Sequence, residues 1–254
     1  RNGNGGDCMN GTRAFASRTV KELLRDPLNL AFGLGFPLVL LLLMTAIQAN
    51  IPVSIFELDT LTPGVAIFGL SFISLFSATL ISKDRTTSFL MRLFASPLSA
   101  SGFITGYTMP LLPMALAQTV VCYACAAALG MQMTLNVLLA IATTIPAALL
   151  FIGIGLLCGS VFNDKQVGGI CGALLTNVSA WLSGTWFDLN LVGGVFKKIA
   201  YALPFAHAVE AGRAAVAGDY GAIMPHLWWV IAYAAVVFAL AVIVFRKKMH
   251  RDNI

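Results

Sequence analysis

The chain has 254 residues, of which 58% are hydrophobic and only 11% are charged, and its mean hydropathy is +0.85. A soluble domain carries about 25% charged residues, so this composition excludes an ordinary soluble protein and predicts an integral membrane protein. The formal net charge of +5 bears first on topology and on lipid head groups. It does not indicate nucleic-acid binding, because the sequence has no basic patch interleaved with aromatic residues.

The N-terminal segment precedes the first apolar run. Residues 1–12 are rich in Gly and Asn and lack periodicity, so we expect a disordered tail or an expression remnant. Over residues 13–27, basic residues fall on one helical face and apolar residues on the other. This pattern predicts an amphipathic helix that lies in the membrane interface and ends at Asp26-Pro27.

Six apolar runs follow, and each is long enough to cross the hydrocarbon core, which takes about 20 residues. The sequence therefore predicts an all-α integral membrane protein with one transmembrane domain over residues 13–254. Its six expected transmembrane helices span about residues 28–49, 61–82, 103–129, 136–162, 167–187 and 225–245.

The region between the last two expected spans, residues 188–221, is too polar and too interrupted to cross a bilayer. We expect short re-entrant helices that dip in from the outer face and are broken at Pro204. A plain extracellular loop is the alternative.

Orientation follows from the basic residues. With these spans, every Lys and Arg except Lys197, Lys198 and Arg213 lies on one side of the membrane. The positive-inside rule places that side, and with it both termini, in the cytoplasm.

The largest polar interruption before residue 188 is the segment 83–113, between the second and third expected spans. We expect Asp84 to cap a short helix that ends at Ser96-Pro97, with two distinct faces. Phe89, Leu90, Leu93 and Pro97 form the apolar face, and Arg85, Ser88, Arg92 and Ser96 form the opposite one. Such a helix suits docking to a soluble partner; a solvated loop that only satisfies the positive-inside rule is the alternative.

Several pieces, in the right order, resemble the membrane subunit of type-2 ABC transporters, the permease half of bacterial ABC exporters. The first region with this resemblance comprises residues 21–27 (KELLRDP) and 36–40 (FPLVL). The second comprises residues 84–85 (DR), 92–98 (RLFASPL) and Gly106, and is similar to the family's cytoplasmic coupling segment. The third comprises residues 182–184 (LSG), 203–205 (LPF) and 210–213 (EAGR). One departure is that Thr86, Thr87 and Ser88 stand where the family usually has further acidic residues and a Gly-Thr.

The resemblance implies a half-transporter in the bacterial inner membrane. Two permeases, as a homodimer or paired with a similar chain, would stand above two copies of a separate ABC ATPase. Contacts to the ATPase would come from Asp84, Arg85, Phe89, Arg92, Leu93, Phe94 and Pro97. The chain itself has no G-x-x-x-x-G-K-[ST] loop, so we expect it to bind no cofactor and to have no ATPase activity, with ATP and Mg used by the partner.

Substrate in this family lies between the second and fifth spans. In the second expected span, Phe68, Phe72 and Phe76 recur every fourth residue and form one aromatic face. The fifth contributes three further candidates, Asn177, Trp181 and Gly184. Apolar walls with few polar groups suit a hydrophobic or amphiphilic substrate, such as a drug-like compound, peptide or lipid. Packing or lipid contact is the alternative for these aromatic residues, and export of lipid-linked glycans or a non-transporting scaffold is the alternative for the function.

Other chemistry has little support in the sequence. Cys122-x-x-Cys125 has redox spacing but lies in an expected span, where small packing residues are common. The three histidines are scattered and predict no metal site. Acidic residues fall at span ends or in loops, which disfavours an ion-coupled secondary transporter.

Overall fold

The computed structural model describes residues 15–22, 25–27, 31–86 and 100–251, with no side-chain placement for residues 86, 100 and 248–251. Every regular element in these ranges is helical, so the predicted all-α class is confirmed. Residues 15–22 form a short N-terminal helix. The elements that follow are η1 (Ala31–Gly35), α3 (Phe36–Gln48), α4 (Leu58–Thr86), α6 (Ala100–Ala128), α7 (Leu135–Val161), α8 (Asp164–Val167), η2 (Gly168–Leu175), α9 (Thr176–Leu182), α10 (Leu189–Val192), α11 (Gly194–Ala202), α12 (Pro204–Ala217) and α13 (Tyr220–Arg251), where η denotes a π-helix.

Within the described residues, 5 helical stretches are long and apolar enough to cross a membrane. They are Ala31–Gln48, Leu58–Arg85, Ser101–Ala128, Leu135–Val161 and Tyr220–Lys247. The expected span over residues 167–187 takes a different form, because α8, η2 and α9 follow one another without a gap but change helix type twice. The three parts of this composite helix have 4, 8 and 7 residues, together about the number that a transmembrane helix needs.

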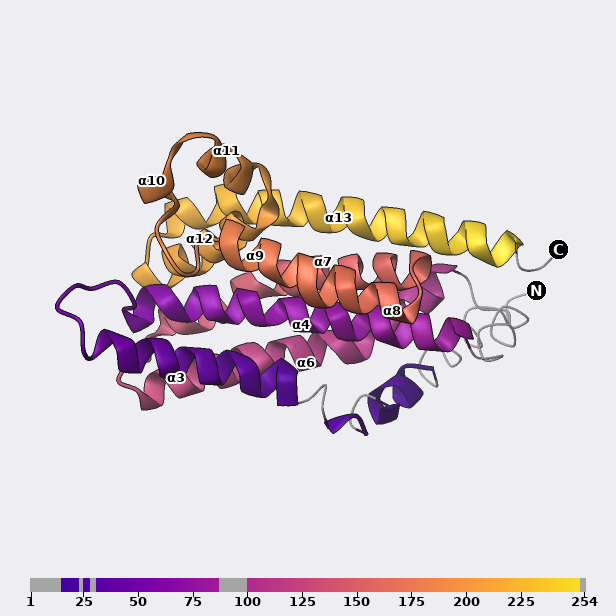
Figure 1. Ribbon diagram of the computed structural model, residues 1–254, viewed down its shortest axis with the longest axis horizontal. Helices are drawn as coiled ribbons and strands as arrows, with labels where there is room; N and C mark the ends of the chain where they lie inside the picture. Colours follow the sequence, from indigo (N-terminus) through magenta and orange to yellow (C-terminus); the bar gives the residue numbers. More distant parts are fainter. Residues whose placement is uncertain (1–14, 23–24, 28–30, 87–99, 252–254) are drawn as a thin grey trace.

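Contacts between distant residues define two ends of the bundle (Figure 1). At one end, Arg18 of the N-terminal helix binds Asp84 of α4, and Phe103 of α6 lies against Phe245 of α13. We call this the basic end, because Lys83, Arg85, Lys165, Arg246 and Lys247 also belong to it. At the other end, here the far end, Arg213 of α12 binds the backbone of Thr60 and Gly184, and Tyr220 of α13 binds Asn136 of α7.

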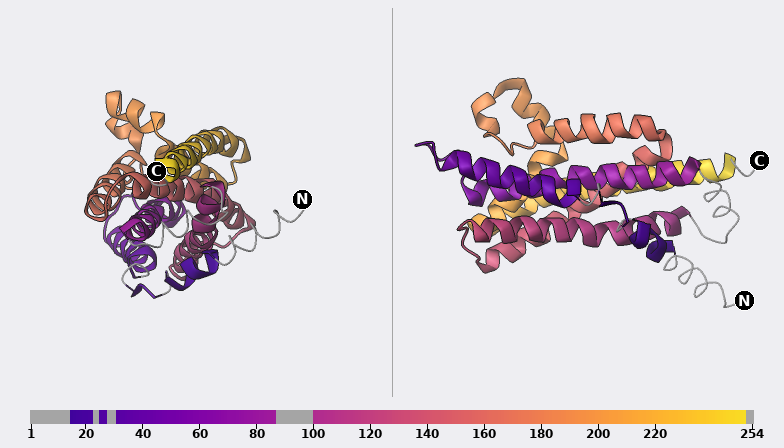
Figure 2. Two further views of the ribbon diagram at one scale, coloured as in Figure 1. Left: turned by 90° about the vertical axis from the view of Figure 1, so that its right-hand side faces the viewer. Right: turned by 60° about the horizontal axis from the view of Figure 1, so that its bottom comes forward.

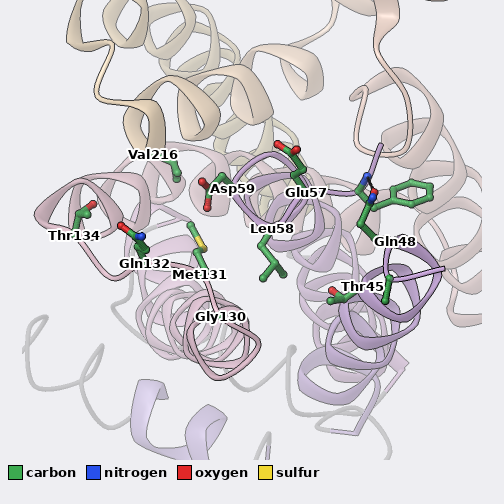
Figure 3. A pocket seen from close by; sticks show the side chains of 12 residues that line it. Thr45, Gln48, Glu57, Leu58, Asp59, Gly130, Met131, Gln132, Thr134 and Val216 are labelled. Carbon is green, nitrogen blue, oxygen red and sulfur yellow. Dashed lines mark hydrogen bonds between the residues drawn. The ribbon is translucent and has the colours of Figure 1, made fainter. Parts of the chain in front are cut away.

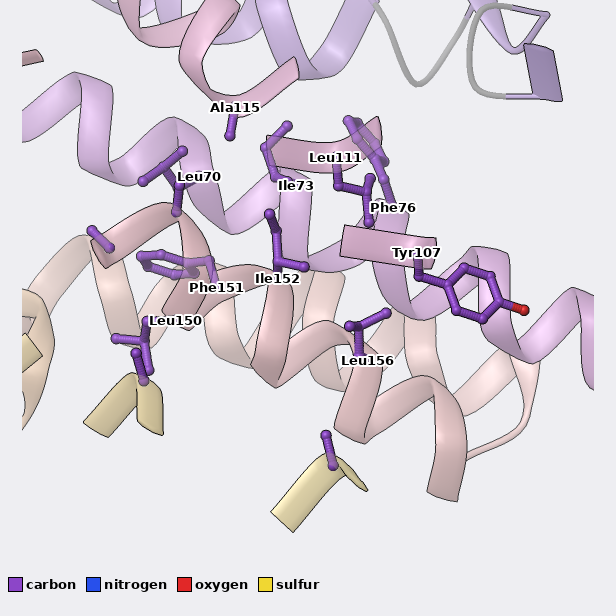
Figure 4. Packing of buried hydrophobic residues seen from close by; sticks show 14 of the residues in the cluster. Leu70, Ile73, Phe76, Tyr107, Leu111, Ala115, Leu150, Phe151, Ile152 and Leu156 are labelled. Atoms are coloured by element: carbon purple, nitrogen blue, oxygen red, sulfur yellow. The ribbon is translucent and has the colours of Figure 1, made fainter. Parts of the chain in front are cut away.

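Helix α4 is the centre of the bundle, and 89% of its most apolar 18-residue window is buried. It packs most extensively against α7, and α7 in turn packs against α13. Leu70, Ile73 and Phe76 of α4 meet Phe151, Ile152 and Leu156 of α7 in the main hydrophobic cluster, which Figure 4 shows. Figure 2 shows α13 and the composite helix α8–η2–α9 on different flanks of this core.

Two glycines on α7 allow α4 and α7 to approach closely. A Cβ at Gly155 would meet the Ser74 carbonyl, and one at Gly159 would lie 2.9 Å from the Cα of Ala78. These contacts involve backbone atoms, which cannot move aside as a flexible side chain can. The pair Gly155-x-x-x-Gly159 therefore packs helices within one chain.

We expect Gly159→Ala to destabilise the protein by about 1–3 kcal/mol, because the added methyl group overpacks the α4–α7 contact. Gly35 in η1 is a matched control, because a Cβ there meets nothing within 4 Å. Thermal unfolding in detergent checks this expectation. Equal midpoints for Gly159→Ala and Gly35→Ala would contradict it.

Helices α10, α11 and α12 lie at the far end (Figure 1). The expected break at Pro204 falls between α11 and α12, where proline occupies the first turn of α12. Gly193 and Gly194 have φ angles of 63° and 56° and form the turn between α10 and α11.

Candidate functional site

The first candidate site is the end of α4 that leads into residues 87–99. The sequence predicts that Asp84 caps a new helix, whereas α4 continues through Asp84 to Thr86. Asp84 is 3% exposed and accepts hydrogen bonds from Arg18 Nη1 at 3.1 Å, Arg18 Nη2 at 2.8 Å and Tyr107 Oη at 2.8 Å. The hydrogen bond with Asp84 is the main reason that the pKa of Arg18 is raised. The carboxylate that was expected to cap a helix is thus hydrogen-bonded by a distant arginine and a tyrosine.

The same turn of α4 is tied to two further helices. Arg85 Nη1 donates to the carbonyl oxygens of Gly159 at 2.9 Å and Phe162 at 3.0 Å, at the C-terminal end of α7. Ser82 Oγ donates to Asp164 Oδ1 of α8 at 2.8 Å. We call this group the basic-end junction; it consists of Arg18, Ser82, Asp84, Arg85, Tyr107, Asp164 and the last carbonyls of α7. This junction immediately precedes residues 87–99 in the sequence.

The N-terminal helix is also anchored by apolar packing. Phe15 is buried, and its ring meets Tyr107 edge-on at 4.8 Å and Phe103 at 6.1 Å between centroids. A Cβ at Gly106 would lie 3.0 Å from an atom of the Phe15 ring, so this ring needs glycine on the facing turn of α6. The N-terminal helix therefore packs on the bundle through Phe15 and Thr19, whereas Val20, on the apolar face expected to enter the membrane interface, is exposed.

The remaining predicted ATPase-contact residues lie outside the described residues: Phe89, Arg92, Leu93, Phe94 and Pro97. Their role stays a prediction. Asp84 and Arg85, the two that the structure describes, belong to the basic-end junction.

The predicted substrate-path residues of α4 do not share one environment. Phe76 is 1% exposed, lies in the main core and touches Gly33. Phe68 and Phe72 contact each other edge-on at 5.8 Å and share Phe36 of α3 as a neighbour, at 6.3 and 5.3 Å. The two sequence-separated aromatics Phe36 and Trp186 complete this group, because Trp186 lies 5.6 Å from Phe68.

The predicted residues near α9 are likewise divided. Asn177 and Trp181 are exposed, and the Asn177 amide donates to the carbonyl of Ala173. Gly184 is buried in a turn with φ of 70°, and its carbonyl accepts from Arg213 at 2.9 Å. Gly184 therefore provides the left-handed backbone conformation that this turn adopts, and its part in a substrate path stays a prediction. The turn after α9 does meet α4 at the far end, where Thr185 donates to the Gly64 carbonyl and Trp186 contacts Phe68.

A comparison with known protein families identifies the family of this chain. The family described as ABC-2 type transporter matches residues 10–217. The chain belongs to the ABC-2 type transporter family. A search of curated proteins finds no match. The matched range contains the N-terminal helix, the basic-end junction and α12.

Membership of the ABC-2 family confirms the predicted resemblance and sets the chain's general role. It is a multi-pass membrane protein and the membrane component of an ABC exporter, without an ATPase site of its own. Members of this family work with an ABC ATPase subunit, which supplies the energy for transport.

At its far end the permease has a cavity of about 690 Å³, which the sequence did not reveal. Gln132 and Asp59 lie on one side of it and Gln48 and Thr45 on the other, as Figure 3 shows. Gln48 also holds the preceding loop, because its amide donates to the Val53 carbonyl and accepts from the backbone of residues 55 and 56. The cavity thus has a defined polar wall.

Also at the far end of the permease, His207 of α12 and His226 of α13 face each other with their Nδ1 atoms 2.8 Å apart. His207 Nε2 lies 2.9 Å from the Tyr201 carbonyl, which can only accept, so this nitrogen carries a proton. Nδ1 of neutral His207 is then the acceptor, and His226 donates. The ring of Trp229 stacks on His207 at 5.3 Å.

Burial lowers the pKa of His207, and the charge of His226 lowers it further, while the Tyr201 carbonyl and Glu210 oppose the shift. In the unfolded chain a histidine has a pKa near 6.5. His207 is therefore protonated more readily in the unfolded chain than in the folded one. We expect stability to be full above about pH 6.5 and to fall as the pH drops through that value toward the lower folded pKa. Unfolding midpoints at pH 7.5 and 5.5 should differ less for His207→Gln than for the parent; parallel changes in both proteins would contradict this.

Proposed function

We propose that this permease is one half of an ATP-driven exporter that moves a hydrophobic or amphiphilic compound out of the cytoplasm. The substrate class comprises drug-like compounds, peptides and lipids, and the direction is outward across a bacterial inner membrane. The observation that carries the proposal is the basic-end junction. It connects the last turn of α4 to the N-terminal helix, α6, α7 and α8, immediately before the predicted ATPase-docking segment.

The membrane arrangement proposed has six crossings, with α8–η2–α9 as the fifth. Two features support it. The first is that the composite helix is about as long as a hydrocarbon core is thick. The second is that its start contacts α4 at the basic end through Asp164, and the turn after it contacts α4 at the far end through Thr185. The basic end would face the cytoplasm, as the positive-inside rule requires.

We further propose that two permeases associate, as a homodimer, through the face of η2 and α9. Along this face Gly168, Gly169, Leu174, Asn177 and Trp181 are exposed, and a Cβ at either glycine meets nothing within 4 Å. The Asn177 amide donates one hydrogen bond to the Ala173 carbonyl, and its remaining polar groups would be costly in hydrocarbon unless a partner satisfies them. Two ATPase subunits, which use ATP and Mg, would dock below the pair.

The substrate path proposed runs beside the aromatic group Phe36, Phe68, Phe72 and Trp186. Phe72 and Trp186 are partly exposed, and flat rings with few polar groups suit an amphiphile. Because Phe76 is enclosed in the core, its part in the path would be to support Phe72 one turn away. Asn177 and Trp181 would extend the path toward the second permease.

The test is reconstitution with the cognate ABC ATPase. We expect the purified permease to bind no ATP, because it has no phosphate-binding loop, and the complex to hydrolyse ATP and accumulate an amphiphilic dye in inverted vesicles. A matched complex with a catalytically dead ATPase is the control. Micromolar ATP binding by the permease alone, or dye movement with the dead ATPase, would contradict the half-transporter. ATPase activity without transport of any compound would indicate a scaffold.

A further inference from the structure

Two cysteine side chains from different helices meet near the basic end. The thiols of Cys158 on α7 and Cys171 on η2 are hydrogen-bonded to each other. Their positions in the sequence are too far apart for a C-x-x-C motif, so only the fold reveals the pair. Both are free thiols, as are Cys122 and Cys125, but the latter two belong to one helix, where a bond between them would connect no further element.

The surroundings of the pair leave one of the two thiols more accessible than the other. Ala78 of α4, Val167 of α8 and Cys171 form a small buried cluster, against which Phe162 and Cys158 pack. Cys171 is buried, whereas Cys158 is partly exposed. A small neutral oxidant therefore reaches Cys158 first, and Cys171 lies beside it as the thiol that reacts next.

The pair lies next to the basic-end junction. Cys158 directly precedes Gly159, whose carbonyl accepts from Arg85 Nη1 at 2.9 Å. Cys171 is the fourth residue of the π-helix η2, and Thr176 Oγ1 donates to its carbonyl at 3.1 Å. π-helices occur frequently at functional sites. The two thiols thus join the core helix that ends at the junction to the composite helix proposed as the fifth crossing.

Packing alone ties the composite helix only weakly to α7. Helix η2 packs mainly on α4 and makes limited contact with α7. A covalent bond between Cys158 and Cys171 would therefore add a fixed connection where the packing is sparse. It would hold α7 and the composite helix together through any step of transport in which they move apart.

We propose that Cys158 and Cys171 form an interhelical disulfide on exposure to a peroxide, and that this disulfide stops transport. The Cys158 thiolate attacks one peroxide oxygen and the O–O bond breaks. The departing hydroxide takes up the thiol proton, which leaves a sulfenic acid and one water. The Cys171 thiolate then attacks the sulfenic sulfur, the S–O bond breaks, the S–S bond forms, and the second hydroxide leaves as water with the Cys171 proton.

In this reaction each sulfur loses one electron and the peroxide gains two. A dithiol reductant reverses the reaction by thiol–disulfide exchange. Formation of the disulfide is independent of the proposed export function, and only its effect on transport rests on that function.

Peptide mass spectrometry tests for the bond without any assay of transport. The purified permease is treated with hydrogen peroxide and denatured, and its free thiols are alkylated with N-ethylmaleimide. We expect the peptides that carry Cys158 and Cys171 to be joined, Cys122 and Cys125 to be alkylated, and dithiothreitol to release both joined thiols. Alkylation of Cys158 and Cys171 after peroxide, a bond from Cys158 to a second copy of the chain, or oxidation of Cys158 to a sulfinic acid instead would overturn the proposal.

Thermal unfolding in detergent gives a second measurement. Because a cross-link constrains the unfolded chain, the peroxide-treated parent should unfold at a higher temperature than the reduced parent. Cys158→Ser should show no such rise, and neither should Cys171→Ser. Cys125→Ser changes another partly buried thiol of a membrane helix, so it is the matched control and should keep the rise. The midpoints without peroxide show that each variant folds, and equal responses of the parent and Cys158→Ser would contradict the proposal.

The complex with the cognate ATPase tests the effect on transport. Peroxide should abolish ATP-driven accumulation of the dye, and dithiothreitol should restore it. The complex with Cys158→Ser should continue to transport in peroxide, which controls for oxidation of the ATPase. Transport that continues after the disulfide has formed, or equal inhibition of the parent and Cys158→Ser, would overturn the proposed effect. A complex that moves no compound even when reduced would contradict the proposed function, and mass spectrometry would still decide whether the disulfide forms.

Discussion

Replacing Arg18 by alanine is expected to lower the free energy of unfolding by about 3 kcal/mol. Asp84 would then be a buried carboxylate that has lost two charge-assisted hydrogen bonds. Removing one partner of a buried ion pair costs about 3–5 kcal/mol. We expect the lower end of this range, because the Arg18 side chain is itself 36% exposed and water screens part of the interaction.

Three companion variants make this expectation specific to the pair. Glu22→Gln removes the other, more exposed partner of Arg18 and should cost less than about 1 kcal/mol. Tyr107→Phe removes one hydrogen bond to Asp84 and should cost about 1 kcal/mol, or somewhat more because the acceptor is charged. Arg18→Ala combined with Asp84→Asn should recover part of the loss, because no uncompensated buried charge remains.

Thermal unfolding in detergent measures all four variants. If Arg18→Ala and Glu22→Gln have the same midpoint, Arg18 is only a surface charge and the junction does not hold the N-terminal helix. Recovery in the double variant would show that the cost comes from keeping the buried Asp84 charge after its arginine partner is removed. The same variants, assembled with the ATPase, would show whether the junction also transmits force.

The all-helical class and the approximate spans could be predicted because hydropathy over about 20 residues depends on local composition alone. The end of α4 could not be predicted in the same way. Asp84 follows the apolar run and looks like a helix cap, and only the fold reveals that Arg18, 66 residues away, pairs with it. A carboxylate has many possible donors in a sequence, and the choice among them is made by tertiary packing.

The aromatic residues of α4 show a related limit. Periodicity correctly places Phe68, Phe72 and Phe76 on one helical face. It does not show which residues pack against each part of that face. Here α3 and Trp186 pack against Phe72 and Phe68, while Gly33 and α6 enclose Phe76. The break of helix type within residues 164–182 was equally hidden, because a hydrophobic run has no signal for a π-helix.

The coupling segment provides the second large expected effect. The apolar residues Phe89, Leu93 and Phe94 share the short segment between α4 and α6, and we expect them to enter a cleft of the ABC ATPase. Burial of each side chain there would contribute about 1.5–3 kcal/mol to docking. Leu93→Asp or Phe94→Asp would replace that gain with the cost of burying a carboxylate, so the ATPase should dissociate and both transport and its stimulation of ATP hydrolysis should be abolished.

These variants should still insert and fold, because residues 87–99 lie between the membrane helices and the basic-end junction that precedes them remains intact. Leu191→Asp is a matched control, since Leu191 is 83% exposed at the far end and receives the same change of chemistry. Copurification of the ATPase, ATP hydrolysis in vesicles and the unfolding midpoint of the isolated permease separate loss of docking from loss of fold. Full transport by both Leu93→Asp and Phe94→Asp would mean that this segment is a solvated loop, and that force reaches the basic-end junction by another route, such as the N-terminal helix that Arg18 and Phe15 hold against α6.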